Sequence, residues 1–185
     1  MADIKVSDNE LMTGFLDVFR KLGYEGASLE ELASASGLKK SSLYHRFPGG
    51  KKQMAEEVLR FTSSWVGTNI TGILKGAGEP KDRLKSALNN INEFYAGGER
   101  ACVLRTLSMS TGLNLFSQPI SNAFGNLIAG FTKLAEDFGH SPKVAAKLAE
   151  DTVIRIQGGL IVSKGTGNLE IFKRMLVDIE KSLIL

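Results

Sequence analysis

The sequence predicts an all-α protein with a small N-terminal module and a larger helical domain. Along almost the whole chain, apolar residues recur three and four positions apart, which is the spacing of one face of a helix. No alternation with a period of two, the pattern of a half-buried strand, persists in any stretch. Turn and capping residues divide the first 50 residues into three short segments and the remainder into longer ones. We therefore expect a three-helix module over residues 1–50 and a second helical domain over residues 51–185.

Two capping boxes mark the starts of the first two helices. Ser7 stands three residues before Glu10, and Ser28 stands three residues before Glu31. In this pattern the serine side chain accepts a hydrogen bond from the backbone N–H of the third helical residue, and the glutamate reaches back to the N–H of the serine. Both helices are therefore expected to begin directly after these serines.

Glycine and proline limit the three short helices. We expect Gly23 to stop the first helix, Gly37 to form the turn between the second and the third, and Pro48 to follow the end of the third. Gly37 suits a tight turn because glycine adopts the left-handed backbone conformation without a steric penalty. The apolar residues predicted to form the core of this module are Phe15, Phe19, Leu32, Leu43 and Phe47.

The following helices are longer and are limited by the same signals. Pro80, Pro119 and Pro142 mark the starts of their segments, because proline is well tolerated in a first helical turn. We expect residues 165–168 to form the last turn. The expected helices cover residues 51–75, 80–96, 102–111, 117–138, 142–164 and 169–182.

Charge and cysteine content limit the classes of protein. Residues 1–38 hold three Lys/Arg against seven Asp/Glu, a net charge of −4, whereas residues 39–60 hold six against two, a net charge of +4. A local basic stretch of this kind is either a solvated face or a place where a polyanion binds. The single cysteine, Cys102, excludes an internal disulfide framework and suits a reducing compartment. Without a basic-then-apolar leader or an apolar run of bilayer length, the expected location is cytoplasmic, with no membrane partner.

Residues 28–47 have the pattern of a helix-turn-helix. A short capped helix is followed by Gly37 in the turn, by Leu38 packed behind it, and by a second short helix that presents hydroxyl, phenol, imidazole and basic groups. In this motif the second helix lies in the major groove of DNA, and its early residues reach the base edges. A purely capping role for Ser28 and a supporting role for the Tyr44 ring are alternative interpretations. The candidate contacts are Ser28, Lys39, Lys40, Ser41, Ser42, Tyr44 and His45.

The stretch Leu43-Tyr44-His45-Arg46-Phe47, together with the capped helix and the turn glycine before it, resembles the N-terminal module of the TetR family of bacterial regulators. The resemblance is confined to about residues 7–54. It implies that a homodimer binds double-stranded operator DNA, and it matches Lys52 to the lysine that binds phosphate in the family. Lys39 departs from the pattern, because it stands where the family often has a serine that caps the recognition helix. We expect the cap to shift to Ser41.

The resemblance also implies that the larger domain dimerises and holds the pocket for an inducer. Aromatic and methionine side chains are abundant there, and pockets for small molecules are lined by such residues with a few polar groups among them. We therefore expect a small hydrophobic or aromatic inducer, with plain core packing as the alternative for each residue. The candidate ligand-binding residues are Phe61, Trp65, Phe94, Arg105, Met109, Phe116, Phe131 and Gln157.

The last two helices are the expected dimer interface. Gly158 and Gly159 lie within a helix, where each costs about 1 kcal/mol relative to alanine, and this cost makes sense where another backbone approaches closely. The last helix carries an apolar stripe, and a twofold dimer supplies the two DNA-binding modules that two half-sites require. On the preceding helix, Arg155 is expected to pair with Asp151. The candidate interface residues are Gly158, Phe172, Leu176, Ile179 and Leu183.

No catalytic or metal-binding pattern is present in the sequence. The chain has two histidines and one cysteine, and it lacks the motifs of zinc proteases, redox dithiols and serine hydrolases. We therefore expect no enzyme activity, no metal and no cofactor. The predicted function is that of a ligand-responsive transcriptional regulator, a repressor that a small hydrophobic inducer releases from a palindromic operator. The alternative is a helical small-molecule carrier with a vestigial helix-turn-helix, and the lysines within residues 39–52 argue against it.

Overall fold

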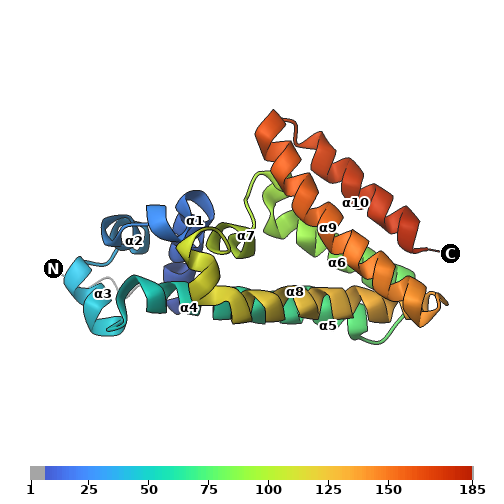
Figure 1. Cartoon of the computed structure of the whole chain (residues 1–185), viewed down its shortest axis with the longest axis horizontal. Coiled ribbons are helices and arrows are strands. Elements are labelled where there is room, and N and C mark those ends of the chain that lie inside the picture. The colour runs from blue at the N-terminus through green and yellow to red at the C-terminus, as the bar shows by residue number, and fades with distance from the viewer. Residues whose placement is uncertain (1–6, 185) are drawn as a thin grey trace. The chain divides into compact units, whose positions relative to one another are not determined.

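The computed structural model describes residues 7–184 and forms ten α-helices within them, with no strand in that range (Figure 1). The predicted all-α class is confirmed. The helices are α1 (Asp8–Gly26), α2 (Leu29–Ser36), α3 (Lys40–Arg46), α4 (Gly50–Val66), α5 (Gly72–Lys75), α6 (Pro80–Phe94), α7 (Val103–Leu107), α8 (Thr111–Asp137), α9 (Pro142–Thr166) and α10 (Glu170–Leu183). A π-helical turn, Gly67–Thr71, joins α4 to α5, and one 3₁₀ turn, Ala96–Gly98, follows α6. Within the described range, no helix is both long enough and apolar enough to cross a membrane.

The described chain forms two compact units. The N-terminal unit contains the residues up to Thr62 together with Val103–Ile120, and the C-terminal unit contains Ser63–Cys102 together with the residues from Ser121 onward. Both α4 and α8 run from one unit into the other. The N-terminal unit therefore includes α7 and the first turns of α8, in addition to the three helices that the sequence assigned to the module.

Helices α1, α2 and α3 close around one apolar core in the N-terminal unit. The five core residues predicted from the sequence are all buried. The rings of Phe15 and Phe47 meet edge to face with their centroids 5.6 Å apart, a favourable arrangement for two aromatic rings. Helix α1 packs against both α2 and α7. The core of the module is thus formed by the side chains that the helical periodicity selected.

Both predicted capping boxes are present. The Glu10 N–H donates to Ser7 Oγ at 3.3 Å, and the Ser7 N–H donates to Glu10 Oε2 at 3.0 Å. The corresponding distances for Ser28 and Glu31 are 3.1 and 2.8 Å. Because an ionised carboxylate accepts these bonds, the bonds from Ser7 lower the pKa of Glu10, and those from Ser28 lower the pKa of Glu31. The starts of α1 and α2 are therefore fixed by local sequence.

Several helix boundaries differ from the sequence prediction: the helix expected over residues 51–75 is interrupted by the π-helical turn Gly67–Thr71, and the one expected over residues 102–111 ends at Leu107. Gly23 does not end α1 but bends it, since its φ is +68° and the helix continues beyond it. Helix α8 begins at Thr111, six residues before the predicted start, and has Pro119 in its interior. The Thr111 N–H, at the start of α8, donates to the Glu25 carboxylate at 2.8 Å. A contact from a distant part of the sequence thus supports helical turns that the local signals did not indicate.

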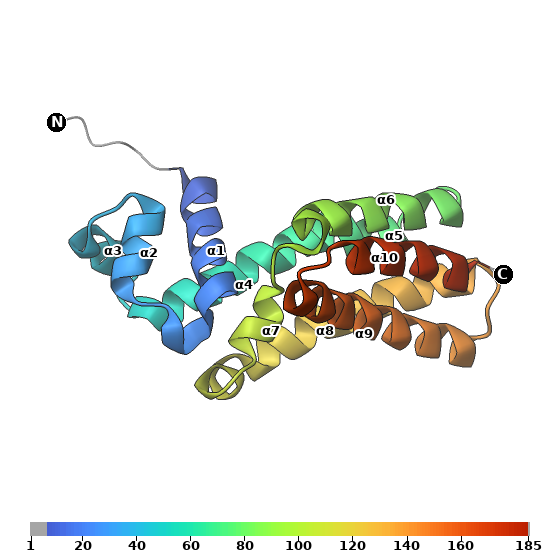
Figure 2. The same ribbon diagram turned by 90° about the horizontal axis from the view of Figure 1, so that it is seen from above.

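In the C-terminal unit, α10 lies along α9 and also contacts α6 (Figure 2). Arg83 of α6 ties neighbouring segments together, because its guanidinium donates to the backbone oxygen of Leu74 and to the Asp137 carboxylate, each at 2.8 Å. Hydrogen bonds from Lys133 and Arg83 lower the pKa of the Asp137 carboxyl below its ordinary value. These charged contacts connect α5, α6 and the end of α8.

Candidate nucleic-acid interface

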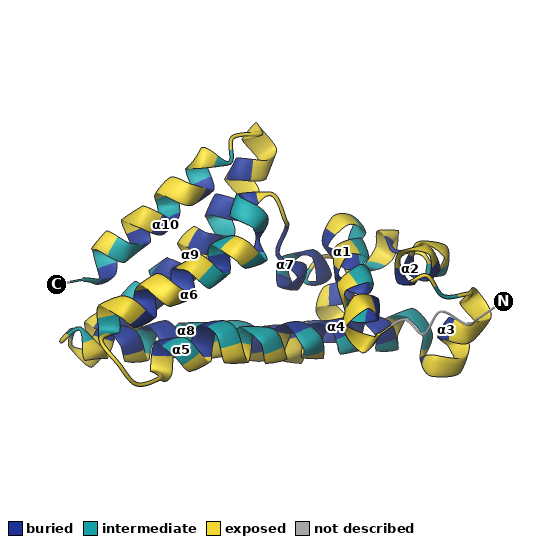
Figure 3. Cartoon of the chain, turned by 180° about the vertical axis from the view of Figure 1, so that it is seen from behind, coloured by how far each residue is buried: buried dark blue, intermediate teal, exposed yellow. Residues whose placement is uncertain are grey.

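Helix α3 exposes most of its surface, as the yellow segments in Figure 3 show. Of its seven residues only Leu43 is buried, and Phe47 directly after the helix is buried as well. The remaining side chains of α3 face solvent. All eight residues predicted to contact DNA are exposed and belong to the N-terminal unit: Ser28, Lys39, Lys40, Ser41, Ser42, Tyr44, His45 and Lys52.

The turn between α2 and α3 depends on Gly37. Its φ is +67°, in the left-handed region that side chains disfavour, and its N–H donates to the backbone oxygen of Ser34 at 3.3 Å. The Leu38 N–H then donates to Ser36 Oγ, also at 3.3 Å. These bonds satisfy backbone groups in the turn and direct the chain into α3, as a helix-turn-helix requires.

Helix α3 begins without a side-chain cap. Its N-cap residue is Lys39, whose side chain makes no capping hydrogen bond, so the predicted shift of the cap to Ser41 is wrong. Ser41 lies within the first turn of the helix, and its hydroxyl is exposed. The start of α3 therefore presents hydroxyl groups that no capping bond occupies.

An open hollow of about 670 Å³ lies beside α3. Its lining combines hydroxyl, imidazole and guanidinium groups with one apolar side chain. Groups of these kinds donate and accept hydrogen bonds at the base edges of the major groove. The lining residues are Leu38, Ser41, Ser42, His45 and Arg46.

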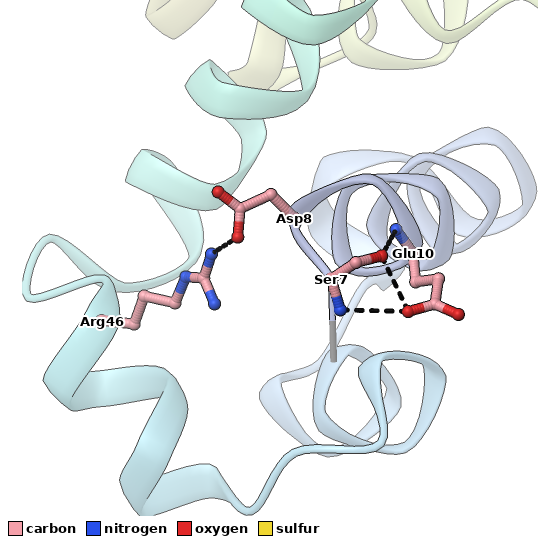
Figure 4. A network of polar contacts seen from close by, with 4 residues as sticks. All are labelled: Ser7, Asp8, Glu10 and Arg46. Carbon is pink, nitrogen blue, oxygen red and sulfur yellow. Dashed lines mark hydrogen bonds and ion pairs between the residues drawn. The ribbon is translucent and has the colours of Figure 1, made fainter. Parts of the chain in front are cut away.

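Acidic side chains contact both ends of α3. The Lys40 ammonium lies 3.3 Å from Glu30 Oε2 on α2. The Arg46 guanidinium donates to the carboxylate of Asp8, the first residue of α1 (Figure 4). Arg46 is not among the residues predicted to contact DNA, although its basic charge at the end of a recognition helix was a usable signal.

Lys51 has a structural role that the sequence pattern did not predict. Its ammonium donates to the backbone oxygen of Ala27 at 2.9 Å and lies 4.6 Å from the ring centroid of Tyr24, as a cation–π contact. Burial of Tyr24 raises the pKa of its phenol. Lys51 therefore ties the start of α4 to the end of α1, whereas its neighbour Lys52 is exposed, with its ammonium 3.7 Å from Glu56.

Helix α7 is fixed to α1 by a buried hydrogen bond. The hydroxyl of Thr106 donates to the backbone oxygen of Phe19 at 2.9 Å. A Cβ on Gly23 would stand 3.3 Å from the backbone oxygen of Thr106, so the glycine bend in α1 also leaves room for α7. Hydrogen bonds from the backbone of Glu25 itself and from Thr111 lower the pKa of the Glu25 carboxyl. Hydrogen bonds to residues 87 and 86 positions later in the chain thus support the module.

Comparison with known proteins identifies the module. Residues 14–58 match the family described as bacterial regulatory proteins of the tetR family. The chain therefore carries the DNA-binding module of the TetR family. It is accordingly a DNA-binding transcriptional regulator of the helix-turn-helix type, as the resemblance of residues 7–54 implied.

TetR-family similarity extends beyond the module. The regulator LmrA of Bacillus subtilis is 23% identical over 161 residues, which cover 85% of this chain and 86% of LmrA. The repressor KstR2 of Mycolicibacterium smegmatis is 33% identical over 76 residues, 41% of this chain and 37% of KstR2. A TetR regulator from Legionella pneumophila superposes with a TM-score of 0.81 at 16% identity over 98% of each chain. A cysteine mutant of CifR, solved with 26-base-pair operator DNA, gives 0.75 at 22% identity over 98% of each chain.

The eight residues predicted to bind a ligand divide evenly between the two units. In the C-terminal unit, the rings of Trp65 and Phe94 stack with centroids 4.4 Å apart and planes 18° apart. Phe131 is fully buried, and Gln157 has a buried side-chain oxygen without a hydrogen-bond partner. The N-terminal unit holds Phe61, Arg105, Met109 and Phe116, and the C-terminal unit holds Trp65, Phe94, Phe131 and Gln157.

Among the predicted ligand residues of the N-terminal unit, Phe116 has a clear packing role. It is fully buried and meets the ring of Tyr24 edge to face at 5.2 Å. Met109 is exposed, and Arg105 approaches its sulfur at 3.9 Å. The structure thus brings Trp65 and Phe94 together as an aromatic pair and places Phe116 in the core of the DNA-binding module's unit.

The apolar stripe predicted to lie between protomers is buried within the chain itself. Phe172, Ile179 and Leu183 are fully buried, and Leu176 is nearly so. The physical reason is that α10 covers α9 and α6, so its apolar face meets the chain's own helices. This corrects the assignment of these four residues to a surface that is free for a partner.

The paired glycines of α9 have two different environments. A Cβ on Gly159 would stand 2.9 Å from the terminal methyl of Met175, so this glycine permits close packing of α10 on α9 within the chain. Gly158 has open space around its Cβ position. Nearby, Arg155 donates to Ser182 Oγ at 3.4 Å rather than pairing with Asp151. Of the predicted interface residues, only Gly158 therefore lies on an open face.

Proposed function

We propose that the chain acts as a dimeric repressor that binds a partly palindromic operator and is released from it by a small hydrophobic or aromatic ligand. The exposed face of α3, held on a three-helix core with its turn glycine in the left-handed conformation, is the observation that carries this proposal. The operator complex of CifR, a protein of the same fold, supports DNA as the partner.

Side chains of α3 and its flanks divide into two proposed roles. Ser41, Ser42 and His45 line the hollow beside the helix and read base edges in the major groove. Lys39 and Lys52 are exposed ammonium groups at its edges and bind phosphates, which supply affinity without sequence information. Further phosphate or edge contacts are assigned to Ser28, Lys40 and Tyr44.

We assign the dimer interface to the open face of α9 instead of the buried stripe of α10. Ile154 and Ile161 are exposed there, and Gly158 and Gly165 have open space around their Cβ positions. These four residues are spaced by four, three and four positions, so they share one face of the helix. Small residues between exposed isoleucines allow a second helix to approach closely. A twofold dimer then presents two α3 helices to successive half-sites of DNA.

Ligand binding is assigned to the C-terminal unit, around the stacked pair Trp65 and Phe94. Trp65 lies near the end of α4, the same helix that carries Lys51 and Lys52 at its start. A π-helical turn begins at Gly67, two residues after Trp65, and the Asn69 side chain in this turn donates to the Trp65 backbone oxygen at 2.9 Å. Such π turns are frequent at functional sites. A ligand that favours one position of α4 changes DNA affinity only if it binds the DNA-binding state and the released state of the protein with different affinities.

Selection from a random DNA library tests the DNA-binding part of the proposal. We expect a partly palindromic motif, and we expect Lys52→Ala to weaken binding to all sequences alike and to lower the salt dependence by about one unit per subunit, as for a lost phosphate contact. Ser42→Asn is expected to change the sequence preference instead. Lys75→Ala, at an exposed lysine of the C-terminal unit, is the matched control and should bind as the unmutated chain does. Failure to enrich any motif would contradict the proposal and favour a ligand carrier.

Titration of hydrophobic and aromatic compounds tests the ligand-responsive part. Because Trp65 is the only tryptophan, its fluorescence reports binding near the Trp65–Phe94 pair. We expect a compound that quenches Trp65 to weaken operator binding about 5- to 150-fold, the usual range for coupling of 1–3 kcal/mol between two sites. Phe94→Leu, which removes the stacked ring, should reduce both effects. A compound that quenches Trp65 stoichiometrically while operator affinity stays constant would show a pocket without a switch.

A further inference from the structure

The recognition helix α3 carries a basic residue at each end, and each one contacts a carboxylate from another helix. Lys40 is the first residue of α3 and lies 3.3 Å from Glu30 of α2. Arg46 is the last residue of α3 and contacts Asp8 of α1 (Figure 4). Acidic side chains from both other helices of the module therefore neutralise the two ends of the helix that faces DNA.

Both carboxylates stand at the surface of the module. The side chain of Asp8 is 86% exposed and that of Glu30 is 81% exposed. Ion pairs in such positions contribute little to stability, because water screens them and two long side chains lose freedom. Neither pair is needed to satisfy a buried charge. The basic partners can therefore exchange one anion for another at small cost.

The helix ends keep these carboxylates stabilised after such an exchange. Asp8 and Glu30 lie in the first turns of α1 and α2, where the helix dipole favours negative charge. The neighbouring Glu10 and Glu31 are engaged in the capping boxes, which leaves Asp8 and Glu30 to contact α3. A phosphate oxygen offers Arg46 or Lys40 the same kind of acceptor as a carboxylate oxygen.

We propose that Asp8 and Glu30 are built-in competitors of DNA phosphates that hold Arg46 and Lys40 until the DNA backbone displaces them. The inference rests on the proposed placement of α3 in the DNA groove. In the free protein the two basic groups are already neutralised, so each phosphate contact is gained at the expense of an internal pair. DNA affinity and its salt dependence are therefore lower than the number of basic residues around α3 suggests.

Neutralising each carboxylate in the full chain tests this inference. Affinities of Asp8→Asn and Glu30→Gln for a random-sequence duplex and for the selected operator should be measured from 50 to 300 mM salt. We expect each variant to bind both DNAs about two- to tenfold more tightly than the unmutated chain near physiological salt. The salt slope should become steeper by up to about one unit per subunit, the value for one added phosphate contact.

The matched control is Asp17→Asn, which changes charge equally on the same helix. Asp17 pairs with Arg20 of α1 at 3.8 Å and not with α3, so a gain below twofold is expected. A second control places Asp8→Asn in an Arg46→Gln background, and Glu30→Gln in a Lys40→Gln background. There the gain should vanish, because the released basic group is absent.

The outcomes separate the inference from the function on which it rests. Equal or weaker DNA binding by folded Asp8→Asn and Glu30→Gln would overturn the inference, since a merely structural ion pair predicts loss rather than gain. Persistence of the gain in the Arg46→Gln and Lys40→Gln backgrounds would also overturn it. If the unmutated chain and all variants bind no DNA even at low salt, the proposed function itself is wrong.

Discussion

Replacing Ile179 by aspartate is expected to unfold the C-terminal unit, whereas replacing Ile161 by aspartate is expected to separate the proposed dimer and leave each chain folded. Ile179 is 0% exposed inside the chain, so an ionised carboxylate there would be buried without a partner, at a cost of several kcal/mol. Ile161 is 50% exposed on the open face of α9, where the charge stays in water in the free chain and becomes buried only in the proposed interface.

Circular dichroism and light scattering distinguish the two results. For Ile179→Asp, we expect loss of helical signal or a sharply lowered melting temperature. For Ile161→Asp, we expect a helical spectrum like that of the unmutated chain. The mass from light scattering should be half that of the unmutated protein, because the variant is monomeric. Leu113→Asp in the N-terminal unit makes a comparable change at a residue that is 49% exposed, and it should leave the mass unchanged. If the Ile161→Asp variant still forms a dimer, the interface lies elsewhere. If the Ile179→Asp variant is as stable as the unmutated chain, the described packing of α10 is wrong.

The periodicity of α10 predicted that one face is buried but not what buries it. An apolar stripe on a helix has the same sequence pattern whether it packs on the chain or on a second copy. The neighbours that decide the matter are distant in sequence: Phe172 meets the ring of Tyr95 at a centroid distance of 6.2 Å, and the imidazole of His140 lies 3.0 Å from the Leu183 backbone oxygen. The sequence therefore indicated the buried residues correctly and their partner wrongly.

Local signals succeeded where the stabilising groups lie within one turn of each other. The capping boxes at Ser7 and Ser28 involve partners three residues away, and both form. The start of α8 is supported instead by Glu25, whose carboxylate accepts a hydrogen bond from the Thr111 N–H, 86 residues later in the chain. The preference of proline for a first helical turn depends only on the position of Pro119 in the sequence, so it could not predict this contact or the earlier start of the helix. The extra turns of α8 were for this reason outside the reach of the sequence pattern.

The candidate site shows the same division. Exposure of α3 followed from the positions of two apolar residues, Leu43 within the helix and Phe47 directly after it, and from the turn at Gly37. The acids that contact its ends were not predictable, because Asp8 and Arg46 are 38 residues apart. The separate roles of two adjacent lysines also depend on geometry. The Lys51 ammonium donates hydrogen bonds to backbone oxygens at the end of α1, whereas Lys52 is exposed to solvent.

Replacing Gly14 by alanine is expected to destabilise the N-terminal unit and to weaken operator binding. A Cβ on Gly14 would stand 2.5 Å from the backbone oxygen of Ala35 and 3.0 Å from its carbonyl carbon, so α1 and α2 would have to separate. Overpacking of this kind costs about 1–3 kcal/mol, which exceeds the gain of up to about 1 kcal/mol from replacing a helical glycine. Because Leu43 packs α3 into the same core, movement of α2 displaces the recognition helix.

Gly125→Ala is the matched control, because Gly125 is a helical glycine in α8 with nothing within 4 Å of its Cβ position. Here only the propensity gain remains, and we expect a stabilisation of up to about 1 kcal/mol with unchanged operator affinity. Thermal unfolding should thus move in opposite directions for the two variants, by about 2–4 °C for each kcal/mol in a chain of this length. For Gly14→Ala, operator affinity should fall more than affinity for random DNA, since base contacts depend on the placement of α3 and phosphate contacts tolerate small shifts. An increase in stability for Gly14→Ala equal to that of Gly125→Ala would show that α1 and α2 do not approach closely at this point.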